Sequence, residues 1–157
     1  MIRLLVVCLG NICRSPMGQG ALEAAVAESM LAGQVAVDSA GTGGWHAGEA
    51  PDPRAIACAR RHGVRIDGQR AQQLSPEAIA AVDWVLCADA DNLAKARSLA
   101  PRGHEAKVVL WLDWAGIRSN GALPDPYYGT DADFERVWQL CTSAAAASVK
   151  KLSASDA

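Results

Sequence analysis

The sequence has no long hydrophobic run. Across its 157 residues, no apolar stretch approaches the roughly 18 residues that a membrane-spanning helix needs, so we expect no membrane span. The hydrophobic segment near the N-terminus, residues 2–8, is short and leads directly into Gly10 and Asn11. It lacks the longer apolar core and small-residue cleavage pattern of a secretory signal, and we therefore expect none.

The chain also lacks a large excess of either charge. Fifteen basic residues stand against 17 acidic ones, for a formal net charge of −2. General binding to nucleic acid or to anionic membranes needs a surplus of positive charge. The composition therefore argues against nucleic-acid and membrane partners.

Paired cysteines are absent too. The sequence has five cysteines and no Cys-x-x-Cys pair: Cys8, Cys13, Cys58, Cys87 and Cys141. An odd, scattered set is a poor match to a disulfide framework or a zinc site, and we see no metal-ligand cluster. We expect a reducing, cytoplasmic location, where an unusual cysteine becomes a candidate for chemistry.

The hydrophobic pattern predicts strands that alternate with helices. We expect buried strands at residues 2–8, 34–38, 84–87 and 107–112. We expect helices at about 16–30, with Ser15 as N-cap, at 53–62 and 131–151, and shorter helices that open near Ser75 and near Asp91. Residues 39–44 are expected to form a loop. This order predicts one α/β domain, residues 1–157, with a four-stranded parallel sheet and helices on both faces.

The first strand ends in the segment VVCLGNICRSP, residues 6–16, at a sheet edge where α/β proteins bind ligands. Backbone N–H groups of the turn and the following helix N-terminus can receive an anion. Asn11 tolerates a left-handed conformation, and Cys8 would lie in a positively polarised setting that favours the reactive thiolate. Arg14 would hold two oxygens of a phosphate-like group, and Ser15 could donate to the thiolate.

This turn also has two simpler interpretations. A lone cysteine at the end of a strand is most often a small buried hydrophobic residue, and Cys-x-x-x-x-x-Arg alone is a loose pattern. The nucleotide-binding loop Gly-x-x-x-x-Gly-Lys-Ser/Thr is absent. Only the combination of strand, Gly-Asn turn, Ser-Pro and helix indicates a nucleophile aimed at an oxyanion.

These residues resemble the signature of the low-molecular-weight protein tyrosine phosphatases. The resemblance covers essentially the whole chain, through motifs in the family's order: CLGNICRSP, SAGT from Ser39, Trp45, DPRA from Asp52, LCADADNL from Leu86 and DPYYG from Asp125. Two motifs at opposite ends of the chain make a chance match improbable.

The resemblance implies a two-step phosphatase mechanism without a cofactor or metal. Cys8 would attack phosphorus and form a cysteinyl-phosphate, while Arg14 and the loop amides stabilise the equatorial oxygens. Asp125 would be the general acid. The implied phosphate-binding loop consists of Leu9, Gly10, Asn11, Ile12, Cys13 and Ser15.

The resemblance also implies an aromatic substrate pocket. Tyr127 and Tyr128 would stand beside the acid and Trp45 on the opposite rim, favouring a flat aryl phosphate, although a single aromatic ring is more often part of a core. Ile12 favours phosphotyrosine, because related protein-arginine phosphatases carry threonine there. The expected partner is a phosphotyrosine-containing protein, and the expected state is a monomer or a weakly self-associating chain.

We expect no catalytic role for the remaining cysteines or for the histidines. The family's loop cysteine, here Cys13, can form a protective disulfide with the nucleophile; a passive small residue behind the loop is the equally weighted alternative. The other three cysteines read as core. His46, His62 and His104 are expected to lie at the surface or at helix ends, without a catalytic role.

Three positions depart from the family pattern. In the family, a serine matching Ser39 and a histidine hold the loop asparagine. Gln69 stands in place of that histidine, Gln72 in place of an arginine, and Gln19 in place of a glutamate. We expect Ser39, Gln69 and Asp89 to support the loop, with a weakened contact between Gln69 and Asp89.

Three other functions are partly compatible with the sequence. A thiol-type arsenate reductase would need a second reactive cysteine pair after residues 84–87, but only Cys87 is there and Ala94 follows. A phosphotyrosine-binding module without turnover would be marked by loss of Cys8, Arg14 or Asp125. A thiol-redox role would leave Asp125 and the aromatic residues unexplained.

Overall fold

The computed structural model describes residues 1–117 and 121–155; the predicted domain of residues 1–157 also includes 118–120 and 156–157, which lie outside the described part. The described chain contains one four-stranded sheet in the order β2-β1-β3-β4, and every neighbouring pair is parallel. The strands are β1 (Ile2–Cys8), β2 (Val35–Gly41), β3 (Trp84–Cys87) and β4 (Val108–Leu110). The predicted fold class is therefore confirmed.

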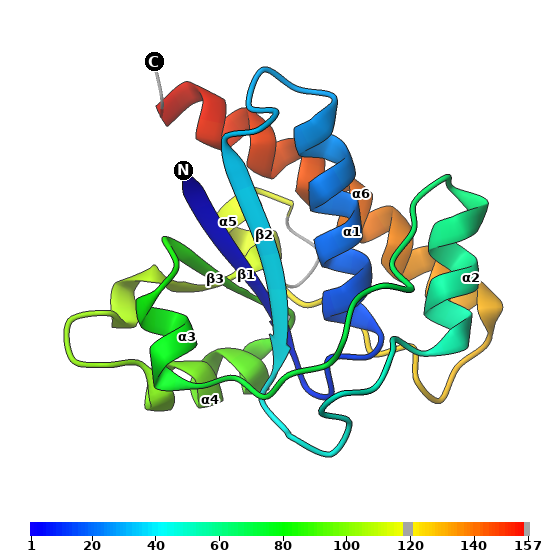
Figure 1. Ribbon diagram of the computed structural model, residues 1–157, viewed down its shortest axis with the longest axis horizontal. Helices are drawn as coiled ribbons and strands as arrows, with labels where there is room; N and C mark the ends of the chain where they lie inside the picture. Colours follow the sequence, from blue (N-terminus) through cyan, green and yellow to red (C-terminus); the bar gives the residue numbers. More distant parts are fainter. Residues whose placement is uncertain (118–120, 156–157) are drawn as a thin grey trace.

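Helices cover both faces of this sheet (Figure 1). They are α1 (Arg14–Ala27), α2 (Pro53–Arg61), α3 (Pro76–Ala80), α4 (Ala90–Leu99), α5 (Trp111–Ala115) and α6 (Asp131–Ser155). Successive side chains of a strand point to opposite faces. Leu4, Val6 and Cys8 accordingly join the core beneath α1 and α6, whereas Leu5 and Val7 join the core on the side of α3 and α4.

The end of β2 differs from the prediction. Ser39 to Gly41 belong to the strand rather than to a loop, because Cys8 pairs with Gly41 in the parallel register. Backbone bonds continue beyond it: Thr42 donates to the Cys8 carbonyl and Gly43 to the Leu9 carbonyl, both at 2.9 Å. Backbone hydrogen bonds thus hold β1 and the residue after it, Leu9, to β2 and the two residues that follow β2.

Three other boundaries are corrected. The helix α1 begins at Arg14 with Cys13 as N-cap, and it ends at Ala27. Ser15 is not the N-cap, because its hydroxyl lies inside the first turn beside Cys8. The last strand ends at Leu110, where α5 begins; Trp111 is fully buried there and its indole N–H donates to Ser148 Oγ at 2.9 Å.

Candidate active site

The β1–α1 loop (residues 8–15) forms a tight turn at the carboxyl edge of the sheet. Asn11 adopts the left-handed conformation expected of it, with φ of 58°. Among the residues that the structure describes, the backbone N–H groups of residues 9–13 donate no hydrogen bond. These amides are therefore available to an anion that binds at the start of α1.

The thiol of Cys8 lies against a hydroxyl group. Cys8 Sγ is 3.0 Å from Ser15 Oγ, and Ser15 Oγ accepts a hydrogen bond from Asn11 Nδ2 at 2.7 Å. Because the Asn11 amide occupies an acceptor position of the hydroxyl, the Ser15 proton can be donated to sulfur. A thiolate at Cys8, which can only accept, would be stabilised by this arrangement.

A buried network fixes Asn11 in its unusual conformation. Its Nδ2 also donates to Ser39 Oγ at 3.0 Å, and its Oδ1 accepts from the Gln72 backbone N–H at 2.9 Å. Ser39 Oγ in turn donates to Gln19 Oε1 at 2.8 Å. Asn11 is only 2% exposed, so these bonds form away from water and hold the loop rigidly.

Gln69 occupies a different place from the one expected. Its Nε2 donates to the Pro16 carbonyl at 3.0 Å, and its buried Oε1 has no partner among the described residues. The expected contact between Gln69 and Asp89 is wrong, because Asp89 pairs with Arg14. Gln69 thus supports the first turn of α1, whereas Gln72 supports Asn11 through its backbone and binds the Ser39 carbonyl at 2.9 Å through its side chain.

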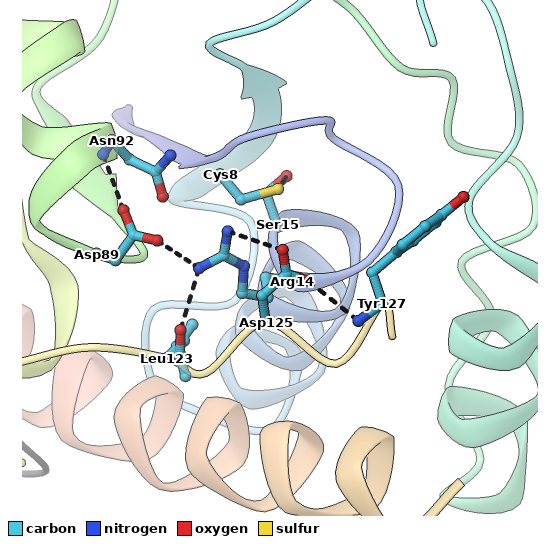
Figure 2. Close-up of polar contacts among 8 residues, drawn as sticks. All are labelled: Cys8, Arg14, Ser15, Asp89, Asn92, Leu123, Asp125 and Tyr127. Carbon is cyan, nitrogen blue, oxygen red and sulfur yellow. Dashed lines mark hydrogen bonds and ion pairs between the residues drawn. The ribbon is translucent and has the colours of Figure 1, made fainter. Parts of the chain in front are cut away.

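Arg14 is held between two carboxylates (Figure 2). Its Nη1 donates to Asp89 Oδ2 at 2.7 Å and to the Leu123 carbonyl at 3.1 Å, and its Nη2 lies 3.7 Å from Asp125 Oδ2. Burial disfavours the charge, but Cys8 and the two carboxylates favour it, so the pKa of Arg14 lies above its ordinary value. A fixed positive charge therefore stands beside Cys8.

Asp125 faces the same space from the segment before α6. Its Oδ1 accepts from the Tyr127 backbone N–H at 3.1 Å, and 44% of its side chain is exposed. Tyr127 and Tyr128 pack edge to face with ring centroids 4.9 Å apart. Asp125 is thus oriented by its own turn while it remains open to a bound molecule.

These groups surround one cavity of about 230 Å³. Its lining brings together most of the site residues expected from the sequence: Cys8, Leu9, Gly10, Ile12, Cys13, Arg14, Trp45, Asp125, Tyr127 and Tyr128. Asn11, Ser15, Ser39, Gln69 and Asp89 are not part of this lining; they stand behind it. The rim is aromatic, with Trp45 70% and Tyr128 95% exposed.

Two residues beside the cavity, His46 and Arg54, were not among the site residues predicted from the sequence. His46 lines the cavity, and its ring packs so close to Gly10 that a Cβ added there would lie 3.1 Å from it. The only feature of the sequence that indicated this position is that His46 directly follows Trp45. Arg54 donates to Asp52 at 2.9–3.0 Å and to the Tyr127 carbonyl at 3.0 Å. The DPRA motif signalled its importance but not this contact.

Arg54 and Asp52 join both sides of the cavity. Asp52 caps α2 by accepting from the Arg54 N–H at 2.8 Å, and its own N–H donates to the Ile12 carbonyl at 2.8 Å. The side-chain hydrogen bond from Arg54 lowers the pKa of Asp52 below its ordinary value. The start of α2 thereby ties the β1–α1 loop to the turn that carries Asp125.

All five cysteines are free and buried. Burial, and then the nearby carboxylate of Asp52, raise the pKa of the Cys13 thiol far above its ordinary value, so Cys13 remains a thiol near neutral pH. Cys58, Cys87 and Cys141 are fully buried, as expected of core residues. A Cys8–Cys13 disulfide stays a prediction.

The comparison with known families agrees with this geometry. The family model described as "Low molecular weight phosphotyrosine protein phosphatase" matches residues 3–156. The chain belongs to this family. It is a protein-tyrosine phosphatase, which is a hydrolase.

Relatives cover nearly the full length of the phosphatase. The low molecular weight phosphotyrosine protein phosphatase of Sus scrofa is 36% identical over 154 residues, covering 95% of this chain and 94% of that protein. The crystal structure of YfkJ from Bacillus subtilis superposes with a TM-score of 0.92 at 34% identity, covering 100% and 98% of the two chains. The crystal structure of a protein tyrosine phosphatase from Entamoeba histolytica, with Hepes in the active site, superposes with a TM-score of 0.94 at 27% identity and covers 100% of both chains.

The structure can also be compared with the expectation that the chain has no membrane span. Across residues 1–117 and 121–155, no helix combines the length and the apolar character needed to cross a bilayer. The expectation of no membrane span agrees with this finding.

Proposed function

We propose that the phosphatase hydrolyses phosphotyrosine with Cys8 as nucleophile, Arg14 as the phosphate-binding cation and Asp125 as general acid. The observation that carries this assignment is their convergence on one cavity, although Asp125 comes from the opposite end of the chain. The first step forms the bond between Cys8 Sγ and phosphorus and breaks the bond between phosphorus and the tyrosine oxygen. Asp125 donates its proton to that oxygen as it leaves.

The second step reverses these roles. Water attacks phosphorus, and the Asp125 carboxylate takes its proton, while the bond between sulfur and phosphorus breaks. The Cys8 thiolate leaves as an anion that accepts a hydrogen bond from Ser15, whose Oγ lies 3.0 Å away. Inorganic phosphate is then released.

The chain itself supplies the charge that the transition state needs. Negative charge spreads over the equatorial oxygens of the transferring phosphoryl group. The Arg14 guanidinium and the N–H groups of residues 9–13 stand around the position of these oxygens, fixed before the substrate arrives. We propose that no metal or cofactor takes part and that residues 1–157 act as a single phosphatase domain.

The shape of the cavity supports a phosphotyrosine-containing protein as substrate. Trp45 and Tyr127 provide apolar faces on its rim, between which a phenyl ring can be held. Ile12 also lines the cavity, and its apolar side chain matches the apolar body of an aryl phosphate. We further propose a cytoplasmic enzyme without nucleic-acid partners that is a monomer, or that self-associates weakly through its exposed aromatic rim; sedimentation at several concentrations tests the last point.

Kinetics with variants test the residue assignments. Hydrolysis of aryl phosphates is followed with EDTA present for the parent, Cys8→Ser, Asp125→Asn and a matched exposed control, Asp131→Asn. We expect no turnover by Cys8→Ser, a kcat lowered about 10²–10⁴-fold with little change in KM for Asp125→Asn, and parental kinetics for the control.

The leaving group sharpens this test. An acidic phenol leaves without help, so the loss in Asp125→Asn should shrink as the phenol becomes more acidic. An equal loss for every phenol would contradict the general-acid role. A parent protein that binds phosphotyrosine peptides but shows no turnover under reducing conditions would contradict the whole proposal.

A further inference from the structure

A second cluster of reactive side chains lies between α2 and α6. Cys58 belongs to α2, His62 follows its last residue, and Glu135 belongs to α6. One donor atom from each, the sulfur, an imidazole nitrogen and a carboxylate oxygen, lie within 4.8 Å of one another. None of the three lines the catalytic cavity.

The fold creates this cluster from a short local pattern and one distant residue. Cys58 and His62 stand four positions apart, which places them on one face of a helix. His62 stacks on Trp138 with ring centroids 5.5 Å apart and an interplanar angle of 18°, so the orientation of its ring is defined. Glu135 lies 73 positions further along the chain, which is why the sequence did not reveal the cluster.

We propose that Cys58, His62 and Glu135 bind a borderline divalent cation such as Zn²⁺. Thiolate, imidazole and carboxylate are the ligand types that zinc takes, and three protein ligands leave a fourth position for water. This donor set disfavours Mg²⁺ and Ca²⁺, which select oxygen ligands alone.

One of the existing distances already fits tetrahedral coordination, and the other must lengthen when the metal binds. Zinc bonds of about 2.0–2.3 Å place tetrahedral ligand atoms roughly 3.3–3.7 Å apart. Cys58 Sγ lies 3.4 Å from Glu135 Oε2, and His62 Nε2 lies 2.5 Å from Glu135 Oε1. Side-chain exposures of 33% for His62 and 36% for Glu135 leave these two groups room to adjust, whereas Cys58 is fully buried and fixed.

Binding exchanges a proton for the metal. Burial and the Glu135 carboxylate raise the pKa of the Cys58 thiol to about 11, so coordination releases the thiol proton to solvent as the bond between sulfur and metal forms. No electron is transferred. Two side chains that now contact Glu135 must move when the cation binds. Arg61, which is half exposed, has its Nη2 3.8 Å from Glu135 Oε2, and Gln139 has its Nε2 3.1 Å from Oε1.

Cobalt is a suitable probe because a bond between thiolate and Co²⁺ gives a charge-transfer absorption that zinc does not. We would titrate Co²⁺ into the Cys8→Ser protein, in which the catalytic thiol cannot contribute. We expect a thiolate-to-cobalt band that saturates at a single ion per chain and is abolished by added Zn²⁺.

Ligand variants in the same background identify the site. Cys58→Ser should abolish the band, and the partly exposed ligand variants His62→Gln and Glu135→Gln should weaken Co²⁺ binding by more than about tenfold. His104→Gln, at a histidine outside the cluster, should bind as its parent does. Circular dichroism confirms that each variant is folded. The proposal is overturned if the parent shows no band, if the band survives Cys58→Ser, or if His62→Gln binds cobalt normally.

Discussion

Replacing Asp89 with Asn tests the ion pair that holds Arg14 in the β1–α1 loop. Asp89 uses both carboxylate oxygens: Oδ2 lies 2.7 Å from Arg14 Nη1, and Oδ1 accepts from the Asn92 N–H at 2.8 Å as the N-cap of α4. Asn caps a helix as well as Asp does. The substitution therefore keeps the cap but replaces Oδ2 with an NH2 group, which removes both the charge and the acceptor opposite a guanidinium that is 4% exposed.

The expected loss of stability follows from that burial. Removing one partner of a fully buried ion pair costs about 3–5 kcal/mol. Asp89 is 27% exposed, so water screens part of the interaction, and the Leu123 carbonyl remains as a partner of Arg14. We expect a loss of about 2 kcal/mol for Asp89→Asn, within the range of hydrogen bonds to charged groups. Asp89→Ala also loses the cap and should cost about 1 kcal/mol more.

Urea unfolding and steady-state kinetics measure the two consequences. The free energy of unfolding should fall as stated, and kcat should fall between about ten- and a hundredfold because Arg14 is no longer held in position. Asp91→Asn, at an exposed acidic residue in the first turn of the same helix, is the matched control and should resemble the parent. If Asp89→Asn and the control unfold at the same urea concentration, the ion pair contributes nothing and the reasoning fails.

Three further predictions concern the supports of the cavity. Asn11→Ala loses three buried hydrogen bonds and forces alanine into a φ of 58°, so the free energy of unfolding in urea should fall by about 3 kcal/mol. Asn11→Gly should recover roughly 1 kcal/mol of that loss. Equal stability of the two variants would refute the role of strain. The contact with Arg54 lowers the pKa of Asp52. The contact therefore stabilises the fold in full above about pH 4, and this stabilisation is lost as the pH falls through the pKa of Asp52 in the folded protein. The difference in unfolding free energy between the parent and Asp52→Asn should therefore shrink from about pH 7 to about pH 3, and a constant difference would count against the ion pair. In Gly41→Ala, the added Cβ would lie 2.8 and 3.0 Å from backbone atoms of the β1–α1 loop, so kcat and stability should both fall, the latter by about 1–3 kcal/mol. Gly68→Ala, which meets nothing within 4 Å, is the control, and similar losses in both variants would exclude the steric cause.

Local sequence patterns predicted much of the scaffold. The aliphatic run of β1 and the segment WVLC of β3 gave strands with the bounds found in the structure, because a buried parallel strand is nearly all apolar whatever its neighbours are. Ser75 was likewise expected at the start of α3, where its hydroxyl accepts from the Ala78 N–H. Such features can be predicted from the residue types of one short segment.

Features that depend on distant partners were predicted less well. The strand β2 extends to Gly41 because Leu74 and Gln72 supply backbone partners there. The strand β4 is cut short at Leu110, where α5 begins and the Trp111 indole reaches Ser148 on α6. In both cases the residue types alone were compatible with the wrong boundary.

The residue types of the proposed site were already evident from the sequence: a cysteine, an arginine and a serine on one turn, and an aspartate between two prolines. The side chains that support them became evident from the folded structure. Asp89 binds Arg14 rather than Gln69, Gln72 rather than Gln69 meets Asn11, and Glu135 joins Cys58 and His62. The physical reason is that the residue types of a turn follow one another along the chain, whereas a hydrogen-bond partner is chosen by distances of a few ångströms across the folded chain.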